Sequence, residues 1–246
     1  MTSPTGFAPW IKHFAGAAAS NSAPVVVFPH AGGAAAAYRS LAIALSVAGP
    51  DTYIVQYPQR ADRLTHPASP TIEELAAELF DAGDWAQVAP LRLFGHCMGA
   101  IVAFEFARIA ETRGVTVHQL WASAGQAPST VAGSPRVPTT DRELLADIAD
   151  LGGTDPMLLE DEDFVDLLLP AVRADYQAFN RYHCEVGVRI GADIHVIGGD
   201  DDHRVQPEWL RRWELHTSAV FTETVLDGGH FYINEHLDLV AELVSA

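Results

Sequence analysis

Several residue types that mark particular protein classes are scarce in this sequence. Among 246 residues there are two cysteines, Cys97 and Cys184, which is typical of a reduced, cytoplasmic protein. Fifteen Lys and Arg stand against 32 Asp and Glu, and the formal charge of −17 argues against nucleic acid or an anionic membrane surface as partner. The first residues lack a basic segment followed by an apolar one, and no apolar run approaches the ~20 residues of a membrane span. We expect a cytoplasmic protein without a membrane anchor.

Motifs for metals and cofactors are missing as well. No two histidines have the i, i+4 spacing of a helical metal site, and no Cys-x-x-Cys occurs. The first predicted strand is not followed by Gly-x-Gly-x-x-Gly, so a dinucleotide is not indicated. We therefore expect no metal site and no cofactor of the protein's own.

Short β-branched runs alternate with helical patterns along most of the chain. The length and a hydrophobic content of 48% suit a single α/β domain over residues 1–246, with a mostly parallel sheet and helices on both faces. Thr71 and Glu74 are placed as a capping box. The predicted strands are residues 24–28, 52–57, 91–94, 117–123, 193–197 and 220–226, and the predicted helices are residues 34–48, 71–87, 97–112, 207–216 and 233–244.

One stretch, at about residues 127–191, breaks this alternation. A Pro-rich loop leads there into helical patterns at 141–151 and 161–182, without a convincing strand. An insertion of helices between two strands predicts a lid over the carboxyl ends of the sheet, where ligands bind in open α/β folds. Five acidic residues between 160 and 166 are interpreted as a solvated face.

Cys97 occupies the position of a nucleophile. An apolar strand runs into Gly95-His96-Cys97-Met98-Gly99 and then into an apolar helix, the form of a nucleophile elbow in an α/β-hydrolase fold. A tight turn leaves no room for side chains at Gly95 and Gly99. A thiol at a helix N-terminus gains thiolate character, whereas the alternative for Cys97 is simple packing in the core. Cys184 is assigned to packing.

A histidine and an acid are expected after the nucleophile in this fold. His230 lies on a glycine loop after the last predicted strand and is the predicted general base. Asp200, Asp201 and Asp202 follow the preceding strand, and their spacing alone does not select among them.

The oxyanion hole requires two backbone N–H groups. One is predicted to come from Met98, after the nucleophile, and the other from Ala31, in the glycine-containing loop after the first predicted strand. His30 in that loop is expected to pack rather than to contact substrate.

Taken together, five segments of the sequence resemble the type II thioesterases that accompany nonribosomal peptide and polyketide synthases. The resemblance covers nearly the whole chain and departs at Cys97, since most of the family has serine there. It implies that Asp202, before His203-Arg204-Val205, is the catalytic acid. The matching strings are Phe-Pro-His-Ala-Gly-Gly at 28–33, Tyr-Pro-Gln-Arg at 57–60 with glutamine in place of glycine, Leu-Gly-Gly-Thr at 151–154, Leu-Pro-Ala-Val-Arg-Ala-Asp at 169–175 and Gly-His-Phe at 229–231.

The resemblance implies release of acyl or aminoacyl groups from the phosphopantetheine arm of a carrier protein. We expect the protein to be a monomer. Arg204, Arg211 and Arg212 are conceivable contacts for an acidic carrier. A cysteine nucleophile leaves a second function open. An acyl group on Cys97 remains a thioester and therefore stays activated for transfer to another acceptor. An acyltransferase that passes it to an amine, a hydroxyl or a second carrier thiol is the second possibility. A non-catalytic carrier-binding protein is the third.

Overall fold

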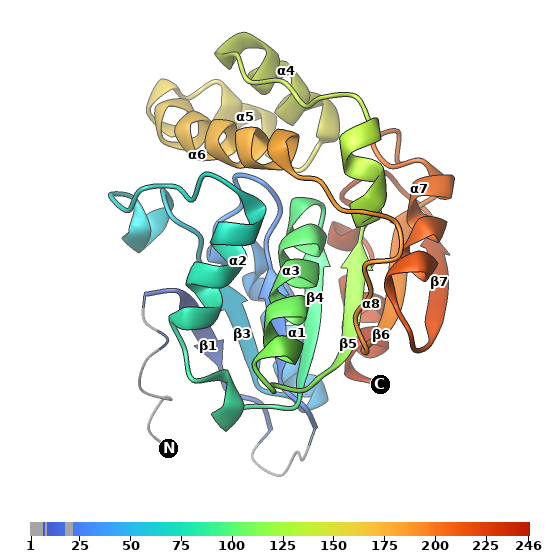
Figure 1. The fold of residues 1–246 in the computed structure, drawn as a ribbon. Helices are drawn as coiled ribbons and strands as arrows, with labels where there is room; N and C mark the ends of the chain where they lie inside the picture. The colour runs from blue at the N-terminus through green and yellow to red at the C-terminus, as the bar shows by residue number, and fades with distance from the viewer. Residues whose placement is uncertain (1–6, 8, 18–21) are drawn as a thin grey trace.

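The computed structural model describes residue 7, residues 9–17 and residues 22–246. The strands in this part of the chain are β1 (Ile11–Phe14), β2 (Val25–Phe28), β3 (Thr52–Val55), β4 (Leu91–His96), β5 (Val117–Ser123), β6 (Asp193–Gly199) and β7 (Phe221–Leu226). They form one sheet in the order β1-β3-β2-β4-β5-β6-β7. All neighbours pair in parallel except β1, which runs antiparallel to β3 at one edge (Figure 1). The predicted α/β-hydrolase fold with a mostly parallel sheet is confirmed.

The six predicted strands are present, with ends shifted by up to two residues, but β1 was not predicted. It has four residues, and Lys12 and His13 interrupt its apolar character. Such a short edge strand depends on its pairing with β3 rather than on a pattern of its own. The sequence therefore carried little signal for it.

Helices lie on both faces of the sheet (Figure 1). One face carries α2 (Ile72–Asp81) and α3 (Met98–Thr112), and the other carries α1 (Arg39–Ala48) and α8 (Leu237–Ser245). The predicted helix 71–87 was too long, because α2 ends at Asp81 and a separate 3-10 turn follows at Trp85–Gln87. The predicted helix 207–216 is divided into α7 (Pro207–Arg211) and a 3-10 helix. Thr71 Oγ1 accepts the Glu74 N–H at 3.1 Å, as the predicted cap requires.

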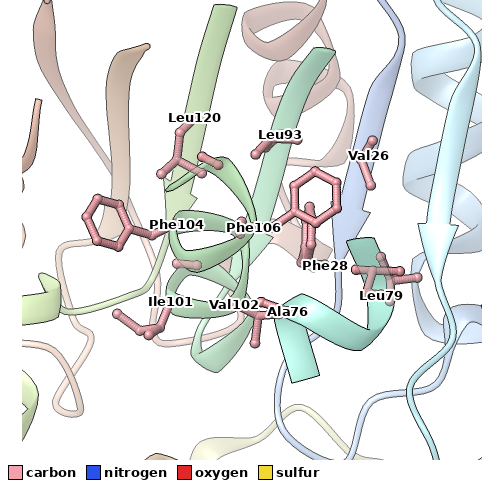
Figure 2. Packing of buried hydrophobic residues seen from close by; sticks show 14 of the residues in the cluster. Val26, Phe28, Ala76, Leu79, Leu93, Ile101, Val102, Phe104, Phe106 and Leu120 are labelled. Atoms are coloured by element: carbon pink, nitrogen blue, oxygen red, sulfur yellow. The ribbon is translucent and has the colours of Figure 1, made fainter. Parts of the chain in front are cut away.

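Helix α3 is buried on nearly all sides, which fixes the position of its N-terminus. Side chains of the helix and the strands beneath it interdigitate in the main core (Figure 2). Residues 98–107 of the helix are all buried, so its N-terminal part has no solvated face on which to shift. The residues labelled in this core are Val26, Phe28, Leu93 and Leu120 from the sheet, Ala76 and Leu79 from α2, and Ile101, Val102, Phe104 and Phe106 from α3.

Three helices between β5 and β6 cover the carboxyl ends of the strands (Figure 1). They are α4 (Asp141–Leu151), α5 (Pro156–Leu159) and α6 (Glu162–Arg181), and we call them the lid. The short helix α5 was not predicted. A small core of Leu144, Ile148, Leu169, Val172 and Tyr176 joins α4 to α6. The acidic run at 160–166 is exposed, as its interpretation as a solvated face requires.

None of the helices in the described part of the chain combines the length and the apolar character that a bilayer crossing requires.

Candidate active site

The turn between β4 and α3 holds Cys97 in a strained conformation. Its backbone angles are φ 56° and ψ −123°, and its side chain is partly exposed. A Cβ at Gly95 would lie 2.3 Å from the Gly99 carbonyl oxygen, and one at Gly99 would lie 2.1 Å from the Phe28 carbonyl oxygen. Side chains at either position would therefore push the turn away from the sheet. The geometry is that of the predicted elbow.

His230 and Asp202 meet on the loops that follow β7 and β6. His230 Nδ1 lies 2.9 Å from Asp202 Oδ2, and the two side chains are 0% and 2% exposed. The other carboxylate oxygen, Oδ1, accepts the Arg204 N–H at 2.8 Å and is thereby fixed. Asp200 instead accepts the Gly228 N–H at 2.9 Å on the surface. Of the adjacent carboxylates, Asp202 is the one that the structure places on His230.

The thiol of Cys97 and the imidazole of His230 shift each other's pKa. Burial alone raises the pKa of Cys97, but the charge of His230 and the Met98 N–H outweigh it, and the thiol pKa is lowered. Burial alone lowers the pKa of His230, but the charge of Cys97 and the hydrogen bond to Asp202 raise it to about 10. His230 Nε2 is buried and has no hydrogen-bond partner among the described residues. The arrangement favours a thiolate beside an imidazolium.

The loop after β2 leaves the N–H group of Ala31 unused. Tyr38 Oη accepts the His30 N–H at 3.2 Å, Asp175 Oδ2 accepts the Gly32 N–H at 2.7 Å, and the His30 carbonyl accepts the Gly33 N–H at 2.9 Å. In contrast, no hydrogen bond of the Ala31 N–H is found in the described part of the chain. This donor is thus available for a ligand.

A cavity of about 380 Å³ brings these groups together. Ala31, Cys97, Met98 and His230 all line it, beneath the lid. Its remaining walls come from the segment after β5, the lid, the acid loop and α7, and they include Arg136, Asp147, Tyr176, Arg204 and Trp209. An acyl thioester could therefore reach the thiol, the imidazole and the two N–H groups in one space.

A second hydroxyl–histidine pair lies behind this site and was not predicted. Ser123 Oγ is 2.8 Å from His96 Nδ1 and 2.5 Å from the Tyr232 hydroxyl. Both Ser123 and His96 are 0% exposed, and neither lines the cavity that contains Cys97. Burial, followed by the charges of His230 and His30, lowers the pKa of His96 well below its ordinary value. The pair joins β4 to β5 and to Tyr232 in the core.

The other residues singled out from the sequence have more ordinary surroundings. His30 Nδ1 lies 2.7 Å from the Tyr38 hydroxyl, and His30 also lines a second cavity beneath the lid. Cys184 is buried. Arg204 pairs with Asp147 of α4, and Arg211 lies 3.2 Å from Glu223. No group of three or more His, Cys, Asp or Glu side chains in the described residues could hold a metal ion.

The two thiols are expected to differ in reactivity. Iodoacetamide at neutral pH should alkylate Cys97 at least tenfold faster than Cys184, because the pKa of Cys97 is lowered whereas burial raises the pKa of Cys184. A lowered pKa keeps the thiolate populated as the pH falls, so the rate at Cys97 should decline at a lower pH than the rate at Cys184. Peptide mapping of the labelled protein measures both rates. Equal labelling would make Cys97 an ordinary buried thiol.

Comparisons with known proteins identify the family of the chain. A model of the thioesterase domain matches residues 23–246. Phenyloxazoline synthase MbtB of Mycobacterium tuberculosis is 63% identical over 240 residues, which are 98% of this chain but 17% of MbtB. Thioesterase PikA5 of Streptomyces venezuelae is 36% identical over 228 residues, covering 92% of this chain and 80% of PikA5.

Solved structures give the same result. The type II thioesterase BorB from the borrelidin biosynthetic cluster is similar with a TM-score of 0.82 and 37% identity, covering 99% of this chain and 98% of BorB. The family match spans most of the chain, from β2 through the lid to α8. The chain therefore belongs to the thioesterase domain family and has the α/β-hydrolase fold.

Proposed function

We propose that this thioesterase releases acyl groups from the phosphopantetheine arm of a carrier protein through an acyl-enzyme on Cys97. The observation that carries the proposal is the cavity shared by Cys97, His230 and Ala31. Ser123 and His96 are fully buried outside it, so a substrate has no route to that hydroxyl. The similarity to BorB and PikA5 supports the carrier-bound substrate class.

In the acylation step, the Cys97 thiolate attacks the thioester carbonyl carbon. The N–H groups of Ala31 and Met98 stabilise the negative charge that develops on the carbonyl oxygen, and each such donor is typically worth about 10²–10³ in rate. When the carbon–sulfur bond to pantetheine breaks, His230 gives its proton to the departing thiolate. The products of this step are a free carrier thiol and a thioester on Cys97.

In the deacylation step, neutral His230 takes a proton from a water molecule that attacks the new thioester. The Cys97 thiolate leaves, the carboxylic acid departs and the imidazolium is restored. Asp202 orients the ring through Nδ1, which leaves Nε2 facing the reaction. Delivery of the acyl group to an amine, a hydroxyl or a second carrier thiol uses the same steps with a different acceptor. The buried His230–Asp202 pair favours either reaction over non-catalytic carrier binding.

We infer the acyl group from the similarity to one relative and from a cavity beneath the lid. The similarity to phenyloxazoline synthase MbtB leads us to propose an aromatic acyl group. A second cavity of about 490 Å³ under the lid adjoins the first and shares Ala31 and Tyr176 with it. Its walls include Phe164, Leu168 and Phe231, which suit an apolar ring. The chain corresponds to 17% of MbtB.

Intact-protein mass spectrometry tests the proposed function. A benzoyl-loaded carrier domain is mixed with the enzyme, with and without an amine or thiol acceptor, and the loss of the acyl mass is followed. We expect free benzoic acid, and peptide mapping after rapid acid quench should place the transient adduct on the peptide that contains Cys97. An adduct on the peptide that contains Ser123 would overturn the proposal, and acyl transfer to the acceptor would replace hydrolysis with transfer.

Carrier recognition is expected to involve Arg136 at the edge of the cavity. The structure gives this side chain no ion pair among the described residues, although the protein carries a charge of −17. Arg136 and Arg181 also line two adjoining cavities, of which one includes Glu143 and the other contains no carboxylate. Arg136→Glu should raise KM for the acyl-carrier at least fivefold, because it reverses the charge that faces an acidic partner. KM for the N-acetylcysteamine thioester of the same acid, which has neither phosphate nor carrier, should remain within twofold. An equal rise for both substrates would contradict a role in carrier recognition.

A further inference from the structure

One lid residue touches the loop that presents the free N–H of Ala31. Asp175 on α6 is 6% exposed, and its Oδ2 accepts the Gly32 N–H at 2.7 Å. Gly32 directly follows Ala31, although Asp175 lies 143 residues further along the chain. The same oxygen accepts a hydrogen bond from Arg60 Nη2. A buried carboxylate therefore joins the lid to the loop after β2.

Arg60 is itself held at this point. Its side chain is 5% exposed, and Nη1 donates to the Pro58 carbonyl at 2.6 Å. Arg60 thus belongs to the segment after β3, while Asp175 belongs to the lid and Gly32 to the loop after β2. Three separate parts of the chain converge on one carboxylate oxygen.

Close packing accompanies the hydrogen bond. Gly32 has φ +76°, and a Cβ built on it would lie 2.4 Å from Val172 Cγ2 and 3.5 Å from Leu168 Cδ1. Both side chains belong to α6, one turn and two turns before Asp175. Only glycine allows α6 to approach the loop this closely.

The peptide groups around Ala31 are consequently fixed on both sides. The Tyr38 hydroxyl holds the His30 N–H, and Asp175 holds the Gly32 N–H. The Ala31 N–H shares its peptide unit with the His30 carbonyl, which accepts the Gly33 N–H at 2.9 Å. Loss of the Asp175 acceptor would release Gly32, the residue between these two groups, and so loosen the turn that sets the direction of the Ala31 N–H. An oxyanion donor must be in place before charge develops if it is to lower the barrier.

We propose that Asp175 is a positioning residue for the oxyanion hole: the lid helix α6, through Asp175, holds the loop so that the Ala31 N–H points into the cavity. The proposal rests on the proposed function, because it takes the Ala31 N–H as an oxyanion donor. According to this proposal, the position of α6 affects the rate of the chemical step as well as the enclosure of the substrate.

The test compares variants by kcat and KM on benzoyl N-acetylcysteamine thioester. Asp175→Leu removes the acceptor but leaves Arg60 buried without its partner, which by itself destabilises a fold. The informative variant is the double substitution Arg60→Met with Asp175→Leu, because apolar replacement of a whole buried ion pair is often tolerated. Asp175→Asn keeps an oxygen for the Gly32 N–H. Arg173→Met is the matched control, since it breaks the Arg173–Asp141 pair within the lid and does not involve the loop.

We expect the double variant to lose at least tenfold in kcat, with KM within about threefold of the parent, and Asp175→Asn to recover most of that loss. Arg173→Met should keep the parent kcat. The alkylation rate of Cys97 should be unchanged in all of them, because it depends on the thiolate and not on the oxyanion hole. Recovery of the parent kcat in the double variant, or a change confined to KM, would show that Asp175 serves the fold or the pocket alone. Absence of an acyl group on Cys97 in the parent enzyme would instead refute the proposed function. Failure of the positioning role and failure of the proposed function are therefore distinguishable.

Discussion

Substitution of His230 by alanine is expected to lower kcat/KM for an acyl thioester by about 10²–10⁴-fold. The imidazole stabilises the Cys97 thiolate, protonates the departing thiol and activates the attacking water, so each chemical step loses a participant. Steady-state release of thiol, followed with a thiol-reactive chromophore, measures the change. The rate of alkylation of Cys97 at neutral pH should fall as well, since part of the pKa lowering comes from His230.

His236→Ala is the matched histidine control. His236 lies 2.9 Å from the Asp227 carbonyl oxygen, away from the cavity, and its loss should leave kcat/KM within twofold. The acid is tested alongside, and Asp202→Asn should cost more than Asp200→Asn because Asp202 alone of the two contacts His230. A His230→Ala protein that kept a tenth or more of the parent rate would exclude His230 as the base.

Replacement of Cys97 by alanine should abolish the acyl-enzyme and reduce turnover to the background rate. Ser123→Ala should retain the acyl-enzyme and the turnover, because the Ser123 hydroxyl is fully buried and hydrogen-bonded to His96 and Tyr232. Thermal melting of the two variants is the necessary control, since loss of the Ser123 contacts is expected to lower stability. Full turnover in Cys97→Ala, or loss of turnover in a folded Ser123→Ala protein, would transfer the nucleophile's role to the serine.

Cys97→Ser distinguishes hydrolysis from transfer by its product. An acyl group on serine is an oxyester, which is less activated than the thioester on Cys97. If water is the natural acceptor, the serine variant should keep substantial release of the acid. If a second thiol is the acceptor, delivery to it should disappear while slow hydrolysis remains. Mass spectrometry of both carriers measures the two products, and undiminished delivery by the serine variant would remove the energetic argument for sulfur.

The elements of this site differ in how much local sequence signal they carry. The elbow around Cys97 and the loop that carries His230 were predictable, because each depends on closely spaced glycines at the end of a strand. Spacing did not separate Asp202 from its two acidic neighbours, and the family resemblance selected it, since the choice depends on which loop side chain reaches the imidazole. The buried contacts Ser123–His96 and Asp175–Gly32 join residues 27 and 143 positions apart, and no local pattern marks them. Strand β1 was missed for a similar reason, because its four residues form a strand only through pairing with β3.

The positive φ of Cys97 lowers the stability of the fold at the same position that supplies the nucleophile. A non-glycine residue held in a sparsely populated region of backbone space costs about 1–3 kcal/mol, and the packed core around α3 holds it there. Glycine at residue 97 would relax that backbone, but it would also remove the sulfur. Selection for a more stable fold alone would therefore erode the nucleophile, and the side chain at this position persists only while its chemistry is under selection.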